Sequence, residues 1–366
     1  MVKIPYSDDE LKVIGTHVSA NSASPRWKAM MGDTPRYNTP ITPKENMWKV
    51  INREGAVWIP TGNDVTYVES RINTDHVARA EVMDQGEPQK DEEKGGPDLF
   101  GIEWVFVPVA GGSMVKPGTP FLADANEWYD KVVFPDVDGM DWAGMAELNA
   151  PYKGQPRCVG ATFQNGLFER LISFMDFEGA AMAMIDEDQQ DAIKDLFEKL
   201  CGMYENFIAH YQEAIGIDTV MFHDDWGSQR SPFFSLDTCR EMLVPYLKRL
   251  VDFCHDRGIW FQLHSCGCNE LLVPAMIEAG VDYWNGQDMN DKAKLYELYG
   301  DKILLGMPAP VLPQDATDEE IDAAAKAFVD KYAPTFNEKP FIVAGFGISP
   351  KMTQAIYKHS RIALAK

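Results

Sequence analysis

The sequence has few positively charged residues for its length. Lysine and arginine together number 34 among 366 residues, against 56 aspartates and glutamates, and the formal net charge at pH 7 is −22. A chain this negative repels phosphate backbones and anionic lipid headgroups. We therefore expect neither nucleic acid nor membrane surfaces among its partners.

Long apolar segments are also missing. No run approaches the roughly 18 consecutive apolar residues of a membrane-spanning helix. Residues 1–15 contain Asp8, Asp9 and Glu10 and no apolar core of signal-peptide length. Cysteine occurs only six times. In a chain of this length without a signal sequence, we expect these cysteines to be reduced thiols or metal ligands in a cytoplasmic protein.

Nucleotide-binding glycine motifs are absent as well. No G-x-G-x-x-G sequence follows the first expected strand, and the Gly-Gly-Ser at residues 111–113 lacks the spacing and the lysine of a phosphate-binding loop. The sequence does contain 45% apolar and 25% charged residues, the balance of a globular chain with a sizeable core.

From residue 157 onward, short apolar runs alternate with helical patterns. Strands are expected at residues 158–163, 218–222, 259–263, 281–284, 303–306 and 341–344, and helices at 188–211, 236–257, 270–279, 291–298, 318–332 and 350–363. Apolar strands that alternate with helices indicate a parallel sheet. Without a nucleotide motif, we predict an α/β fold of the (β/α)8 TIM-barrel type.

The first part of the chain has weaker signals. Residues 1–41 are expected as an irregular arm or lid, and residues 42–366 as one barrel domain. Thr42, Pro43 and Glu45 form a capping-box signature for a helix start. Strands are expected at 56–60 and 100–109, and surface loops at 84–97 and 110–120.

Polar side chains concentrate where three of the expected strands end. In chain order they are His223, Asp224, Asp225, Trp226 and Gln229, then His264, Cys266 and Cys268, then Asn285 and Gln287. In a barrel of this type, catalytic residues come from the carboxyl ends of the strands. The sequence therefore predicts the functional site at these three strand ends.

His264 and Cys266 are two residues apart. On an extended segment, side chains at that spacing lie on the same side, so imidazole and thiolate can bind one ion. Catalytic zinc has three protein ligands and one open position, and histidine and cysteine are among its usual ligands. A buried cysteine beside a hydrogen-bonded histidine in the barrel wall explains the short H-x-C motif equally well.

Asp224 and Asp225 are neighbours, so one side chain should point into the barrel and one away. An inward carboxylate can bind a metal or act as a general acid or base. The alternative is a solvated acidic loop or a helix cap. Trp226, near Phe233 and Phe234, can line a pocket for a flat or methyl-bearing ligand, and His223, Gln229, Asn285 and Gln287 are candidates for binding and orienting a substrate.

Several motifs in this region resemble those of a known family. They are FHDDWGSQ at 222–229, S-P-x8-E-x3-P-Y-x-K-R-L at 231–250, LHSCG at 263–267 and IEAGVD at 277–282. They resemble the uroporphyrinogen decarboxylase superfamily, and within it the corrinoid-dependent methyltransferase branch most closely. The resemblance extends, more faintly, from residue 42 to the C-terminus.

This resemblance implies a barrel with its pocket at the strand carboxyl ends, zinc bound by His264 and Cys266, and cobalamin carried by a partner corrinoid protein. The family's decarboxylases have an arginine-rich R-Q-A-G-R motif, which has no counterpart near Arg26, Arg36 or Arg53. Members that methylate thiols supply a late cysteine, but residues 345–347 are Gly-Phe-Gly here.

The third zinc ligand must then be Asp225, Asp224, Cys268 or another carboxylate. A mixed nitrogen, sulfur and oxygen site is suited to activating an oxygen atom. We expect a methyltransferase that moves a methyl group from an O-methylated small molecule to a protein-bound corrinoid. Methoxylated aromatics are the favoured class of substrate. Three alternatives stay open: methyl transfer from methylcobamide to a thiol or folate, decarboxylation, and non-catalytic binding of a corrinoid or tetrapyrrole.

Overall fold

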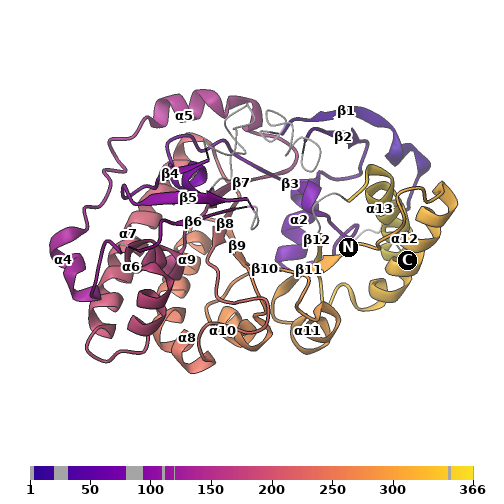
Figure 1. Ribbon diagram of the computed structural model, residues 1–366. Coiled ribbons are helices and arrows are strands. Elements are labelled where there is room, and N and C mark those ends of the chain that lie inside the picture. Colours follow the sequence, from indigo (N-terminus) through magenta and orange to yellow (C-terminus); the bar gives the residue numbers. More distant parts are fainter. Residues whose placement is uncertain are drawn as a thin grey trace.

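A computed structural model of the protein describes residues 4–19, 32–79, 94–108, 112–118, 120–344 and 348–365. Seven parallel strands form its largest sheet, in the order β12-β11-β10-β9-β8-β7-β3 (Figure 1). They are β3 (Val65–Tyr67), β7 (Cys158–Phe163), β8 (Thr219–His223), β9 (Trp260–Ser265), β10 (Tyr283–Gly286), β11 (Leu304–Pro308) and β12 (Ile342–Ala344).

The sheet curls until its two edges meet. Thr61, just before β3, forms a parallel bridge to Val343 of β12. The Val343 N–H donates to the Pro60 carbonyl across a 2.9 Å N···O distance. This contact brings the segment before β3 against the last strand, so the strands enclose a barrel-like interior. The predicted α/β fold of TIM-barrel type is confirmed.

Helices connect the strands on the outer side of the sheet (Figure 1). They include α2 (Pro43–Ile51), α6 (Leu167–Ala183), α7 (Gln190–Ala214), α8 (Leu236–Met242), α9 (Val244–His255), α10 (Val273–Glu278), α11 (Lys292–Tyr299), α12 (Asp318–Tyr332) and α13 (Pro350–Leu364). The capping box expected at Thr42 and Glu45 is present at the start of α2. Within the described part of the chain, no helix has the length and apolar character needed to span a bilayer.

Two small sheets lie apart from the barrel strands. The hairpin of β1 (Val13–His17) and β2 (Thr34–Tyr37) falls in the segment expected to be irregular. A second sheet contains β4 (Gly95–Pro97), β5 (Glu103–Val107) and β6 (Gly112–Val115). The loop predictions for 95–97 and 112–115 were therefore wrong; residues 84–93 lie outside the described residues.

Two further local predictions were wrong. The helix expected at 236–257 is divided at Leu243 into α8 and α9, because Pro245, in the first turn of α9, cannot donate the hydrogen bond that a continuous helix needs. Residues 56–60 contain no strand; only Pro60 and Thr61 pair with β12. Helix α6 occupies a stretch to which the sequence patterns assigned no element.

A buried ion pair attaches the N-terminal segment to the last helix. The Glu10 carboxylate accepts hydrogen bonds from Arg361 at 2.7 and 2.8 Å and from the Tyr357 hydroxyl at 2.6 Å. The two charged side chains are 8% and 1% exposed. Burial acts to raise the pKa of Glu10, but the bonds from Arg361 and Tyr357 outweigh it, so the pKa lies below its ordinary value.

We predict that Glu10→Gln lowers the free energy of unfolding by about 2 kcal/mol, because it leaves the Arg361 charge buried without its carboxylate. Folding lowers the pKa of Glu10. The ionised carboxylate therefore contributes fully to the free energy of unfolding above about pH 4.3, and this contribution is lost as the pH falls through the lowered pKa. Urea unfolding at neutral and acidic pH measures both effects. Glu241→Gln, which breaks an exposed pair with Lys194, is the matched control, and an equal loss in both variants would contradict the prediction.

Candidate metal centre

The register of three strands aligns the predicted site residues. His223 of β8 and Asn285 of β10 both pair with His264 of β9, so the three residues occupy one level of the sheet. The rings of His223 and His264 are 4.8 Å apart, centre to centre. All three strands end at this level or one residue beyond it. The chain segments that follow therefore meet above these residues.

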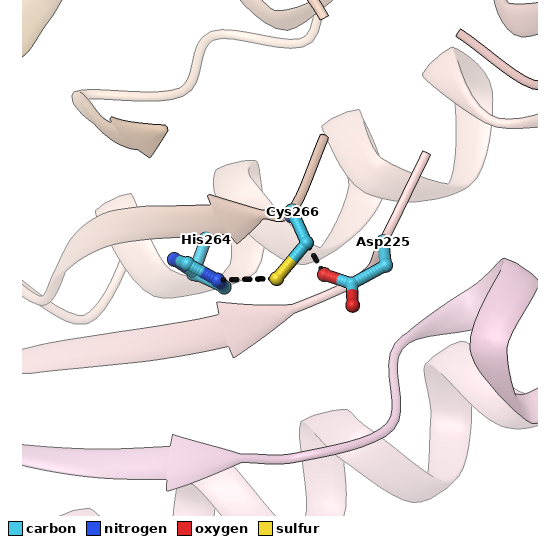
Figure 2. Close-up of side chains that lie close together, drawn as sticks. All are labelled: Asp225, His264 and Cys266. Carbon is cyan, nitrogen blue, oxygen red and sulfur yellow. Dashed lines mark hydrogen bonds between the residues drawn. The ribbon is translucent and has the colours of Figure 1, made fainter. Parts of the chain in front are cut away.

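Three side chains converge there. The ligand atoms of Asp225, His264 and Cys266 all lie within 4.8 Å of one another, and each residue is half-buried. Figure 2 shows the imidazole and the thiol directed toward each other, with the Asp225 carboxylate on the far side of the sulfur. Nε2 of His264 is 3.2 Å from Sγ of Cys266. One nitrogen, one sulfur and one oxygen donor thus come together.

Backbone contacts hold these side chains in place. Oδ1 of Asp225 accepts a hydrogen bond from the Cys266 N–H at 2.7 Å (Figure 2). The His264 ring makes a hydrogen bond with the backbone of Asn285. A metal-binding histidine characteristically uses its second ring nitrogen in this way, because the bond fixes the orientation of the ring.

The loop after β9 packs tightly against the loop after β8. Gly267 has φ +92°, and a Cβ at this position would overlap the Gly227 carbonyl. Any other residue would therefore separate the two loops. Gln287 supports the same turn, since its Oε1 accepts the Gly267 N–H at 2.9 Å. This close approach brings Asp225 and Cys266 within reach of one ion.

Asp224 points away from the triad. Its buried carboxylate accepts the N–H groups of Glu169 at 2.9 Å and Phe168 at 3.3 Å, and the indole N–H of Trp226 at 2.8 Å. It therefore caps the first turn of α6, where the backbone N–H groups have no partner within the helix. Burial raises the pKa of Asp224 to about 6, and these hydrogen bonds work in the opposite direction.

The other predicted site residues are distributed around the centre. His223 and Asn285 lie beside His264, whereas Trp226 is 1% exposed and packs in the core beneath the loop. Gln229 is exposed at the tip of the loop after β8. Cys268 does not belong to the triad, and its N–H donates to the Ser228 carbonyl at 2.8 Å. The late segment at 345–347, where the family's cysteine would be, lies outside the described residues.

Burial keeps the ring and the thiol neutral in the absence of a metal. It lowers the pKa of His264 and raises the pKa of Cys266. For His223, burial and then the neighbouring His264, Arg79 and His76 lower the pKa well below its usual value. A neutral imidazole is the form that binds a metal, and a bound cation would favour the Cys266 thiolate.

Two charged residues beside the triad were missed by the sequence analysis. Arg79 follows α3 (Asp75–Ala78), and Glu169 lies in the first turn of α6. Arg79 is 2.6 Å from Oε1 of Glu169 and 3.8 Å from Oδ2 of Asp225. Burial raises the pKa of Glu169, and the Arg79 guanidinium opposes that shift by favouring the carboxylate. No local pattern marks either residue.

Comparison with known proteins identifies the family. The model of the uroporphyrinogen decarboxylase (URO-D) family matches residues 165–359, more than half of the chain. The chain therefore belongs to the uroporphyrinogen decarboxylase family, and the resemblance predicted from the sequence is confirmed. Among curated proteins, no match is found.

Solved structures share the fold. A methyltransferase from Methanosarcina mazei is 17% identical, with 89% of this chain and 98% of that chain covered and a TM-score of 0.52. D-psicose 3-epimerase is 13% identical, with 63% and 84% covered and a TM-score of 0.35. A sugar phosphate isomerase/epimerase from Parabacteroides distasonis is 10% identical, with 61% and 80% covered and a TM-score of 0.31. At 17% identity, the likeness to the methyltransferase shows a shared fold and nothing more.

We predict that the protein, purified without oxygen, contains about one zinc per chain and that Cys266→Ser contains little, because a hydroxyl is a poor zinc ligand. Cys268→Ser, two residues away and outside the triad, should keep its metal. Elemental analysis of the three proteins measures this. Equal zinc in all three, or zinc lost only from Cys268→Ser, would contradict the assignment.

The two neighbouring aspartates should respond differently to substitution. Asp225→Asn should lose zinc with little change in stability. Asp224→Asn should keep zinc at saturation but lose about 2 kcal/mol of unfolding free energy, because an amide cannot accept all three hydrogen bonds. Zinc titration and urea unfolding of both variants separate the roles, and the opposite pattern would show that the two aspartates have been interchanged.

Proposed function

We propose that the protein is a zinc-dependent methyltransferase that moves a methyl group from an O-methylated small molecule, best a methoxylated aromatic, to a corrinoid carried by a partner protein. The observation that carries this proposal is the convergence of Asp225, His264 and Cys266 at the strand ends. Membership of the uroporphyrinogen decarboxylase family and the barrel shared with a methyltransferase support it.

The three side chains fit zinc. The triad offers one imidazole, one thiolate and one carboxylate, all of them ordinary zinc ligands, and three protein ligands leave a fourth position for a substrate. Hydrogen bonds that the His264 and Asp225 side chains make with backbone groups orient two of the three ligands before a metal binds. Bound in this position, zinc would act as a Lewis acid toward the ether oxygen of the methyl donor.

The reaction itself needs a good leaving group. The corrinoid would be the methyl acceptor and enter as a substrate in its Co(I) form. A carbon–cobalt bond would form with the electron pair of Co(I), which becomes Co(III), as the bond between the methyl carbon and the ether oxygen breaks. The electron pair of the broken bond would stay on oxygen, which would take up a proton from solvent and leave as a hydroxyl.

The chain's residues bind and orient the donor. His223, neutral and beside His264, can hydrogen-bond the donor near the triad, and Asn285 lies next to it at the same level. Asp224 caps the first turn of α6, so of the two neighbouring aspartates Asp225 is the one directed toward the site. Gln287 contributes by fixing the loop that carries Cys266.

A different ligand set separates this function from methylation of a thiol. Members of the family that methylate thiols supply a late cysteine, whereas the triad here includes a carboxylate, and no cysteine follows Cys268. An oxygen ligand in place of a thiolate leaves more positive charge on the metal, because a carboxylate donates less electron density. That favours polarisation of an ether oxygen.

We predict that the wild-type protein, incubated without oxygen with cob(I)alamin and a panel of methoxylated aromatics, forms methylcobalamin and the corresponding phenol. Cys266→Ser should lose this activity because it loses the metal. Absorbance follows the corrinoid, and chromatography follows the phenol. Methylation of a thiol or of a folate from methylcobalamin, with no demethylation of any ether, would instead support the alternative reaction direction.

A further inference from the structure

We infer that the Tyr283 hydroxyl and the Asn285 side chain form a binding site for a second polar group of the methyl donor, an uncharged hydroxyl on its ring. The inference rests on the proposed function and deepens it, because it names the class of donor as a methoxylated phenol. The site lies over Gly306, inside the barrel and beside the metal centre.

The register of the sheet places this site next to the metal centre. Asn285 of β10 pairs with His264 of β9. The pairing of β10 with β11 reaches Trp284 and Leu305. The next residue on each strand, Asn285 and Gly306, therefore share one level. Neighbouring strands lie about 4.8 Å apart, so Gly306 is two strand spacings from the histidine of the triad.

The side chains of this site point into the barrel. The Tyr67 hydroxyl of β3 donates a hydrogen bond to Gln262 of β9 at 3.1 Å. These strands are not neighbours in the sheet, so the bond crosses the barrel interior. Gln262 therefore points inward, and so does Tyr283, which pairs with it. Asn285, two residues further along β10, points the same way.

Gly306 brings the two polar groups to the same place. A Cβ on Gly306 would be 2.9 Å from Oη of Tyr283 and 3.2 Å from Oδ1 of Asn285. Both oxygens therefore face the side of Gly306 where other residues carry a side chain. The Cβ of Ala344 would be 3.0 Å from the same point, so the space is narrow. One small polar group over Gly306 can reach both partners, and any side chain on that residue would obstruct it.

The two polar groups have hydrogen-bonding capacity to spare. Among the residues that the structure describes, no hydrogen bond uses the Tyr283 hydroxyl or the Asn285 side-chain amide. Tyr283 is only 4% exposed, and a polar group left unpaired in so enclosed a place costs about 1–3 kcal/mol. A ligand hydroxyl, which both donates and accepts, would pair with the phenol and the amide.

The chemistry of this pair favours an uncharged ligand group. Burial and then the Tyr67 hydroxyl raise the pKa of Tyr283, and no lysine or arginine among the described residues contributes. The phenol is therefore neutral, and a carboxylate buried beside it without a cation would be costly. Because Gly306 is two strand spacings from His264, the hydroxyl and the methoxyl group belong on opposite sides of the aromatic ring.

One lysine lies near β10, but on the other face of the sheet. Lys292 of α11 donates to the Gly286 carbonyl at 2.8 Å and lies over the ring of Trp284, 4.4 Å from its centre. Trp284 alternates with Tyr283 and Asn285 along the strand, so it points outward. Lys292 is therefore not placed to bind a carboxylate at the proposed site.

Direct binding measurements test the inference. Isothermal titration calorimetry of the zinc-loaded protein compares para-methoxyphenol with para-methoxytoluene, which has a methyl group in place of the hydroxyl. The wild type should bind the phenol about 10-fold more tightly, as expected for one net hydrogen bond. Tyr283→Phe should remove this preference because it removes the hydroxyl partner. Gly306→Ala should remove it because the added methyl group fills the space.

Tyr67→Phe is the matched control. It also removes a phenol hydroxyl from the barrel interior, but one that already bonds to Gln262. This variant should keep the preference for para-methoxyphenol. Circular dichroism establishes that each variant is folded.

Three results would overturn the inference. Equal binding of the two ethers by the wild type, or binding of neither, would show that no hydroxyl site exists. A preference that persists in Tyr283→Phe would place that site elsewhere. Tighter binding of para-methoxybenzoate than of para-methoxyphenol would show that the site selects a charged group. Failure of the proposed function gives a different result, in which the preference is present but no methyl group passes from para-methoxyphenol to cob(I)alamin.

Discussion

The site depends on one buried carboxylate, whose hydrogen bonds all lie within the protein. Asp224 accepts two backbone N–H groups from the start of α6 and the indole N–H of Trp226. These bonds fix the end of β8 against the start of α6, the helix that follows β7. Because adjacent side chains on an extended chain point in opposite directions, fixing Asp224 in the wall turns Asp225 toward the interior.

The second constraint is the close approach of two loops. Gly227 and Gly267 pack against each other with no room for a side chain on Gly267, and the Cys266 N–H bonds to Asp225 across the gap. A carboxylate that has one oxygen bound by the backbone has little conformational freedom to lose when it binds a metal. The three candidate ligands are thus arranged in advance, as the proposed metal site requires.

The parts of this arrangement that join residues close in the sequence could be predicted. The parts that join distant segments could not. His264 and Cys266 are two residues apart on one strand, so their convergence follows from local geometry. The choice between Asp224 and Asp225 depends on α6, a helix that the sequence patterns did not reveal. The sequence suggested that Trp226 lines a ligand pocket, but its indole N–H donates to the buried carboxylate of Asp224. Glu169 and Arg79 come together from distant segments, and neither has a neighbouring motif.

The fold was more predictable than the site. All six barrel strands expected after residue 157 are present within a few residues of their predicted bounds, because buried parallel strands are marked by short apolar runs. Short polar or glycine-containing strands such as β4 and β6 lack that mark. Their pairing with β5 comes from tertiary contacts rather than from local sequence.

The central claim is that one zinc ion is bound by one sulfur, one nitrogen and one carboxylate oxygen. X-ray absorption spectroscopy at the zinc edge tests it most directly. The account predicts a single sulfur neighbour at about 2.3 Å and nitrogen or oxygen neighbours at about 2.0–2.2 Å. Two or more sulfur neighbours would contradict it, because they would require Cys268 or another cysteine in place of Asp225.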